Sequence, residues 1–158
     1  MSERRPSSER GPNVIAPPPL LYLGPLLGGL LLDRLLPLPR LPHAFRWAGS
    51  PLLAAGLALG GWFFATMNRA DTPVDPHRAP TALVEEGPFE FTRNPAYLGM
   101  AFAYTGVTLL AGGRWPLLFL PGVLATINRG VIEREENYLE ERFGSRYTKY
   151  RVRVRRWL

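Results

Sequence analysis

The sequence predicts an all-α fold: an integral membrane helical bundle with about four transmembrane helices and a cytoplasmic C-terminal helix. Three observations support this prediction. Apolar residues make up 46% of the 158 residues and are gathered into four blocks. None of the blocks shows the polar stripe, repeating about every 3.6 residues, of an amphipathic helix on a soluble protein. The net charge of +6 comes mostly from arginines that lie between and after the blocks.

Each block is compatible with a helix that crosses a bilayer, which needs about 20 apolar residues. The stretches Trp47–Asn68 and Asn94–Gly113 contain no charged residue. The first block, Val14–Leu32, and the fourth, Trp115–Asn128, are long enough when a charged or proline-rich end is included. The predicted spans are residues 17–36, 46–68, 95–113 and 115–132.

Two alternatives for these blocks are weaker. A soluble helical bundle would need polar surface, and so small a chain cannot cover four helices that are apolar all round. A signal peptide is the alternative for the first block, but no small-residue cleavage site follows Leu32. The charged pair Asp33-Arg34 follows it instead.

The arginine distribution predicts the orientation. Nine basic residues lie from Arg129 onward, three lie in the loop 69–93 and three in the N-terminal tail, whereas the two connections on the opposite side carry four together. Segments rich in Lys and Arg stay in the cytoplasm. We therefore expect an inner or plasma membrane protein whose two termini and 69–93 loop are cytoplasmic.

Composition excludes several classes of site. The chain has no cysteine, which excludes disulfides, thiolate metal sites and a cysteine nucleophile. With His43 and His77 as its two histidines, no metal centre is expected. The basic charge is concentrated in Arg129–Leu158 among aromatic residues, directly after an apolar block. This pattern favours anionic membrane lipids as partners, and not nucleic acid.

The chain is expected to be a disordered tail over residues 1–13 followed by one domain over residues 14–158. Within this domain, the loop 69–94 is long, and long ordered loops are usually functional. A helical tail is expected over residues 133–158. In the second block, Gly56 and Gly60 form a G-x-x-x-G pattern that allows close helix packing.

Two polar clusters flank the last two blocks. Arg129, Ile132, Glu136, Leu139 and Phe143 recur at spacings of three and four, so they are expected on one helix face that ends at Gly144. Arg129 and Glu136 could then bind a polar ligand inside the bundle, or the carboxylates could simply be solvated.

The segment around Arg93-Asn94-Pro95-x-Tyr97 forms the other cluster. It is either a membrane entry turn or a set of ligand contacts at a helix N-terminus, where backbone N–H groups attract anions.

These two clusters resemble the motifs of one family. Residues 87–99, GPFEFTRNPAYLG, are similar to G-P-(Y/F)-x-x-x-R-(H/N)-P-x-Y-x-G of the isoprenylcysteine carboxyl methyltransferase and phospholipid methyltransferase superfamily. Residues 135–150, EENYLEERFGSRYTKY, resemble its second motif, E-E-x-x-L…F-G-x-x-Y-x-x-Y. The motifs occur in the family's order with a helical hairpin between them, and the resemblance covers about half of the chain.

The resemblance implies an integral membrane, helical enzyme that uses S-adenosylmethionine without a Rossmann fold. It implies that the cofactor pocket includes Leu83, Val84, Arg93, Asn94, Pro95, Tyr97, Glu135 and Glu136. The chemistry is compatible, because carboxylates suit the cofactor's sulfonium and ammonium, and an arginine suits its carboxylate. We further hypothesise that Arg129 holds an anionic acceptor and that Glu136 orients it, which makes these two the candidate catalytic residues.

The acceptor is left open by the resemblance. Asn94 stands where the prenylcysteine enzymes carry histidine, and an amide cannot act as a base. The acceptor is a lipid-like or small molecule: a lipid-like acid, a phospholipid amine, or a small thiol or amine. The alternatives to a carboxyl methyltransferase are a phospholipid N-methyltransferase and a non-enzymatic lipid-binding membrane protein. A small transporter is disfavoured, since two internal halves are not evident.

Overall fold

The computed structural model describes residues 12, 14–39, 41–75 and 78–158, and every regular element in this part of the chain is a helix. The all-α prediction is therefore confirmed. Of the predicted tail over residues 1–13, all but Pro12 lie outside the described ranges. In chain order, the elements are α1 (Pro18–Leu35), α2 (His43–Trp47), α3 (Gly49–Arg69), the 3₁₀ turn η2 (Gly87–Glu90), α4 (Pro95–Ala111), α5 (Trp115–Ile127), the π-helical turn η3 (Asn128–Ile132), α6 (Glu133–Phe143) and α7 (Ser145–Arg153).

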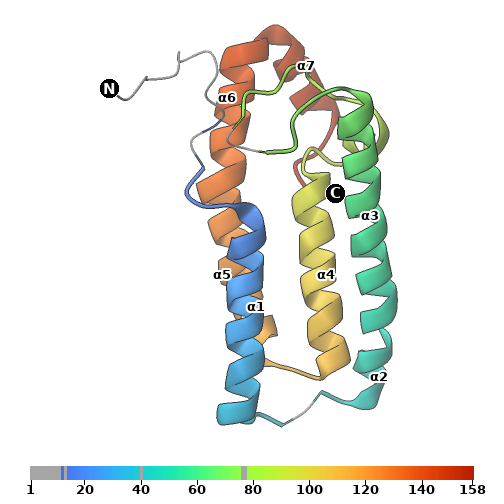
Figure 1. The fold of residues 1–158 in the computed structure, drawn as a ribbon, viewed down its shortest axis with the longest axis vertical. Coiled ribbons are helices and arrows are strands. Elements are labelled where there is room, and N and C mark those ends of the chain that lie inside the picture. Colours follow the sequence, from blue (N-terminus) through green and yellow to red (C-terminus); the bar gives the residue numbers. More distant parts are fainter. Residues whose placement is uncertain (1–11, 13, 40, 76–77) are drawn as a thin grey trace.

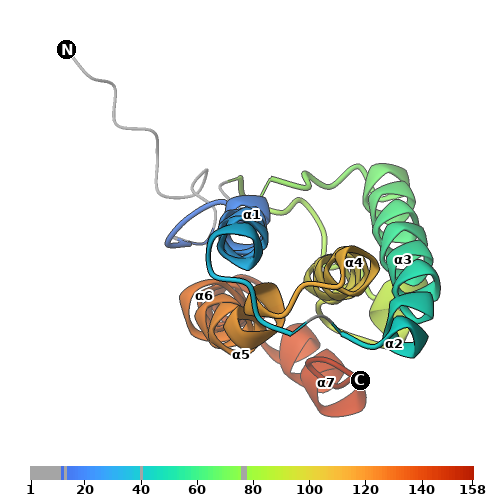
Figure 2. The same cartoon turned by 90° about the horizontal axis from the view of Figure 1, so that it is seen from below.

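Four long helices stand side by side and alternate in direction (Figure 1). The closest pairs are α3 with α4 and α1 with α5, and α4 also contacts α1. Seen along the bundle, α4 lies between α1 and α3 (Figure 2). The end of α3, the start of α4 and the short helices α6 and α7 gather at one end of the bundle (Figure 1).

Proline and glycine mark the helix boundaries at this end. Pro95 occupies the first position of α4, where its missing N–H leaves no helical bond unmade. The helix α6 ends at Phe143, and Gly144 follows with φ of 52°, a conformation that favours glycine. The expected stop at Gly144 is thus confirmed, and the helical tail is split there into α6 and α7.

Two helical stretches are long and apolar enough to cross a membrane, His43–Arg69 and Trp115–Phe143. The other two long helices fall short, because α4 has 17 residues and α1 includes the charged pair Asp33-Arg34. The prediction of about four spans is therefore supported for two helices. Large apolar side chains on the outer faces, including Leu27 and Leu57, are more than half exposed, as lipid-facing residues would be.

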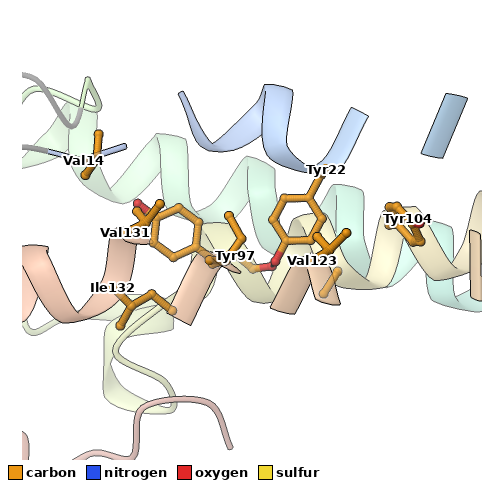
Figure 3. Close-up of a cluster of buried hydrophobic side chains, with 9 residues drawn as sticks. Val14, Tyr22, Tyr97, Tyr104, Val123, Val131 and Ile132 are labelled. Carbon is orange, nitrogen blue, oxygen red and sulfur yellow. The ribbon is translucent and has the colours of Figure 1, made fainter. Parts of the chain in front are cut away.

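The main core joins α1, α4 and the stretch from α5 through η3. The Tyr22 hydroxyl of α1 donates a hydrogen bond of 3.0 Å to the backbone carbonyl oxygen of Tyr97 in α4. Figure 3 shows the Tyr22 and Tyr97 rings next to each other, with Val131 and Ile132 beside Tyr97. Both of these last side chains are fully buried. This core fixes the start of α4 relative to the start of α6.

Glycines bring α3 and α4 into backbone contact. A Cβ atom added to Gly56 would lie 2.6 Å from the carbonyl oxygen of Gly99, and one added to Gly106 would lie 2.5 Å from the backbone nitrogen of Leu53. There is no room for a side chain at these contacts. At the expected partner Gly60 there is room for a side chain, because a Cβ atom there would meet nothing within 4 Å, although the Gly60 backbone nitrogen lies 3.4 Å from a Cβ atom added to Gly99. The contact uses glycines of α4 instead.

The glycine contact gives a direct test of the packing. Replacing Gly56 by alanine should destabilise the fold by about 1–3 kcal/mol, because the new methyl group forces α3 and α4 apart. Gly60→Ala is the matched control, since it makes the same chemical change in the same helix without a clash. Thermal unfolding in detergent should show a lower melting temperature for Gly56→Ala alone. Equal melting temperatures for the two variants would contradict this contact.

Candidate functional site

The candidate site lies at the end of the bundle where the two sequence motifs meet. A second apolar cluster closes this end, and the Tyr150 hydroxyl of α7 donates a hydrogen bond of 2.8 Å to the carbonyl oxygen of Phe89 in η2. Burial raises the pKa of the Tyr147 phenol to about 12, so this hydroxyl stays neutral at physiological pH. The cluster consists of Leu83, Phe89, Leu139, Phe143, Tyr147, Tyr150 and Val154.

Two adjacent cavities, of about 160 and 120 Å³, lie beneath this cluster. The larger cavity also reaches Tyr97 and Pro95, and the smaller one also reaches Leu83, Val84 and Glu136. The structure thus brings all eight residues predicted to hold a cofactor to the walls of these cavities. The residues that line both are Met67, Pro80, Phe89, Arg93, Asn94, Glu135 and Leu139.

A third cavity, of about 400 Å³, adjoins the larger one on the side of the bundle. It lies between α1 and α3 with α4 as its floor, and its wall is mostly apolar. Gly60 and Gly61 of α3 widen it, because neither carries a side chain. The two cavities share Phe63, Val74, Ala96 and Tyr97. We call the third cavity the side groove.

Glu136 is the centre of a buried ion cluster. Its Oε1 accepts hydrogen bonds from Arg93 Nη2 at 2.8 Å and from Arg156 Nε at 3.1 Å, and its Oε2 accepts one from Arg156 Nη2 at 2.5 Å. The Glu136 and Arg93 side chains are 9% and 10% exposed. The hydrogen bonds to Glu136 raise the pKa of Arg156. Arginines therefore hold both carboxylate oxygens, and the hypothesis that Glu136 orients an acceptor stays a prediction.

One buried nitrogen atom of Arg93 has no hydrogen-bond partner in the part of the chain that the structure describes. Arg93 Nη1 donates to the carbonyl oxygen of Arg151 at 2.9 Å and Nη2 to Glu136, and the unpaired atom is the buried Nε. An unpaired buried donor is costly. Arg93 lines both inner cavities, so it brings a positive charge to their walls.

Glu135 has a different environment from its neighbour. The Tyr97 hydroxyl donates a hydrogen bond of 2.6 Å to Glu135 Oε1, so the partner is a neutral phenol and not a guanidinium. Tyr97 lines both the larger inner cavity and the side groove. The Tyr97–Glu135 pair therefore stands where the inner cavities and the side groove meet.

Arg129 does not lie where the spacing predicted. Its side chain is exposed, whereas Ile132 and Glu136 are buried. The reason is η3, whose wider turn holds more residues than an α-helical turn and shifts the phase between Arg129 and Glu136. The residue on the inner face is Asn128, whose Oδ1 accepts a hydrogen bond from Arg156 Nη1 at 3.1 Å. Arg129 is not among the residues that line the two inner cavities.

Sequence reasoning also missed Arg156. Its position among the basic and aromatic residues of the tail predicts a lipid interface instead. Its partner Glu136 lies twenty residues earlier in the chain. No local spacing rule connects residues so far apart, and Arg156 is one of four arginines that follow Tyr150, the last residue of the second motif.

Comparisons with known proteins agree with this placement of the motifs. The sequence model of the phospholipid methyltransferase family matches residues 44–146, well over half of the chain. An uncharacterized protein of Haemophilus influenzae is 39% identical over 62 residues, which are 39% of this chain and 98% of that protein. No solved structure gives a significant match. The chain belongs to the phospholipid methyltransferase family, and its activity is, in general terms, that of a membrane methyltransferase.

Proposed function

We propose that this protein is an S-adenosylmethionine-dependent methyltransferase that acts at the membrane on a lipid-like or small amphipathic acceptor. The observation that carries the proposal is that all eight residues predicted to hold a cofactor line two adjacent cavities. Arg93 and Glu135 lie in the walls of both cavities, and Tyr97 lies in the wall of the larger one. A ligand with an anionic group near a cationic group matches this arrangement, and the family already implies methyl transfer.

The residues fit the cofactor group by group. Its carboxylate is opposite in charge to the guanidinium of Arg93, which lines both inner cavities. The carboxylate of Glu135 suits the ammonium or the sulfonium, and the apolar Leu83 and Val84 suit the adenosine. When bound, S-adenosylmethionine supplies a methyl group on a positively charged sulfur. What the chain contributes is alignment of cofactor and acceptor, which can supply much of the rate.

The side groove supports an acceptor that enters from the membrane. Its mostly apolar wall suits an acyl or prenyl chain, and it meets the inner cavities at Tyr97.

The Asn94 side chain has a structural partner, since its amide Nδ2 donates a hydrogen bond of 2.8 Å to the carbonyl oxygen of Arg156. Chain orientation follows from charge: the arginines of α6 and α7 favour a site and both termini in the cytoplasm.

Cofactor binding is the first test. Isothermal titration of the purified protein in detergent with S-adenosylmethionine should show binding at one site. The thermal melting temperature should rise with cofactor concentration, because a ligand that binds only the folded state stabilises it. Absence of both effects, in a protein that unfolds cooperatively, would contradict the proposal.

A phospholipid amine is the second candidate acceptor, and the Tyr97–Glu135 pair favours it. A carboxylate beside the groove attracts an ammonium group and repels an acid. The two acceptor classes can be separated by supplying methyl-labelled cofactor with membrane extract. Methyl esters of a carboxyl group are released by mild base, whereas N-methyl groups are retained. A label that survives base treatment in the lipid fraction would favour the amine.

A further inference from the structure

The side groove lies beside residues that face outward from the bundle. Leu57 and Phe64 of α3 line it, and both side chains are more than half exposed. Both residues lie in the stretch His43–Arg69, which is long and apolar enough to cross a membrane. Water is a poor occupant of an apolar space, because it finds few hydrogen-bond partners there. Hydrocarbon is therefore the material that fits the side groove.

One end of the side groove meets the larger inner cavity. The two spaces share Ala96 and Tyr97 at the start of α4, and the Tyr97 hydroxyl donates a hydrogen bond to Glu135. The floor of the groove continues along α4 as far as Ala103, which is about 10 Å from Ala96 at a rise of about 1.5 Å per residue. A bound molecule can thus keep a polar group near the Tyr97–Glu135 pair and extend a chain along α4.

Two glycines keep the wall of the side groove open. Gly60 and Gly61 both line it, and a Cβ atom added to either would meet nothing within 4 Å. Gly56 lines it too, but a Cβ atom there would lie 2.6 Å from the carbonyl oxygen of Gly99. Helix packing therefore excludes a side chain at Gly56 and leaves room for one at the other two positions. Because glycine inside a helix lowers its stability, glycines that packing does not require point to a use for the space beside them.

We propose that the side groove binds the hydrocarbon chain of the methyl acceptor, and that Gly60 and Gly61 determine which chains fit. The inference rests on the proposed function and deepens it, because it gives the acceptor's chain a site and names specificity-determining residues. A larger residue at either glycine would fill the side groove. It would leave the inner cavities unchanged, since neither glycine lines them. Acceptor use and cofactor binding should therefore respond separately.

Replacing Gly60 by leucine tests this assignment. With methyl-labelled S-adenosylmethionine and membrane extract, Gly60→Leu should lower transfer to the lipid fraction by about tenfold or more, because the leucine and the acceptor's chain cannot share one space. Its affinity for S-adenosylmethionine, measured by isothermal titration, should change by less than about twofold, because the two sites are separate. Gly61→Leu is a second variant in the same wall and should act in the same direction.

Gly24→Leu is the matched control. Gly24 is an exposed residue of α1 where an added Cβ atom also meets nothing within 4 Å, but it lines none of the three cavities. It should retain the transfer and the affinity of the wild type. Unchanged transfer in both groove variants, or an equal loss in Gly24→Leu, would overturn the inference. A parallel loss of cofactor affinity in a groove variant that still unfolds cooperatively would also overturn it.

A second measurement does not depend on methyl transfer. The wild type is placed in vesicles that contain phosphatidylethanolamine with a diazirine on one acyl chain, and after irradiation the labelled residues are identified by mass spectrometry. Met100 on the groove floor should be labelled in the wild type and not in Gly60→Leu. The exposed Leu118 of α5 reports bulk lipid and should be labelled equally in both.

This measurement also separates the inference from the proposed function. A wild type that binds S-adenosylmethionine but is not labelled at Met100 would overturn the inference and leave the proposed function standing. A wild type that is labelled at Met100 but binds no S-adenosylmethionine would overturn both, and the side groove would then be a lipid site without methyl transfer.

Discussion

Replacing Glu136 by alanine is expected to destabilise the folded protein by about 3 kcal/mol or more. The carboxylate neutralises two guanidinium groups, and the Arg93 side chain is 10% exposed. Removing Glu136 leaves a buried positive charge without a counter-ion, which costs more than the loss of an attraction. Thermal or denaturant unfolding in detergent, with the cofactor absent, measures this effect.

Glu140→Ala is the matched control for this prediction. It lies on the same helix and forms an ion pair of 2.8 Å with Arg151, but each of these two side chains is 40% exposed. A solvent-screened pair contributes about 1 kcal/mol at most. Glu136→Ala should therefore unfold at a clearly lower temperature than Glu140→Ala. Similar stability losses in the two variants would mean that Glu136 is less buried than the structure has it.

Replacing Glu135 by glutamine is expected to have the second large effect, on binding and not on folding. Glutamine keeps the shape and can still accept the hydrogen bond from Tyr97, so stability should change little. The negative charge is lost, and affinity for S-adenosylmethionine should fall by about tenfold or more. Isothermal titration of S-adenosylmethionine and S-adenosylhomocysteine into wild type and variant gives both affinities.

The comparison of these two ligands identifies the group that Glu135 faces. S-adenosylhomocysteine has the same ammonium but a neutral sulfur. A larger loss for S-adenosylmethionine would point to the sulfonium, whereas equal losses would point to the ammonium. Glu141→Gln changes the same charge at an exposed position of α6 and should affect neither ligand. Unchanged affinities in Glu135→Gln would refute its place in the site.

Much of the fold could be predicted because helix formation here is encoded locally. Uninterrupted apolar blocks give the long helices, and Pro95 and Gly144 mark two of their boundaries. The number of membrane spans was harder to predict, because a charged residue at the end of an apolar block can be held by a contact with another helix. Asp33 ends the first apolar block, yet in the structure its carboxylate accepts hydrogen bonds from the backbone N–H groups of Arg114 and Trp115 at the start of α5. A sequence shows the charge but not this helix cap.

The candidate site was predictable to the extent that its residues lie in two short motifs. Arg93 and Asn94 directly precede α4 and Tyr97 lies in its first turn, so the start of one helix places all three. Arg156 joins them through Glu136, which lies 43 positions after Arg93 and 20 before Arg156, and no periodicity reveals this contact. The expectation that Arg129 shares a helix face with Glu136 was wrong for a local reason, because spacing rules assume α-helical turns throughout. The roles of all these residues in binding stay predictions.

The π-helical turn η3 joins α5 and α6, two parts of one continuous helix that present different side chains to different surroundings. Before it, α5 must present apolar side chains outward, and after it α6 must present Glu135 and Glu136 inward. Point substitutions along α5 can change how well its apolar length matches the bilayer thickness, and they do not rotate the carboxylates of α6 about the helix axis. A single inserted or deleted residue would rotate every later side chain by about 100°. Related chains should thus vary freely in composition across this segment and hold its length constant.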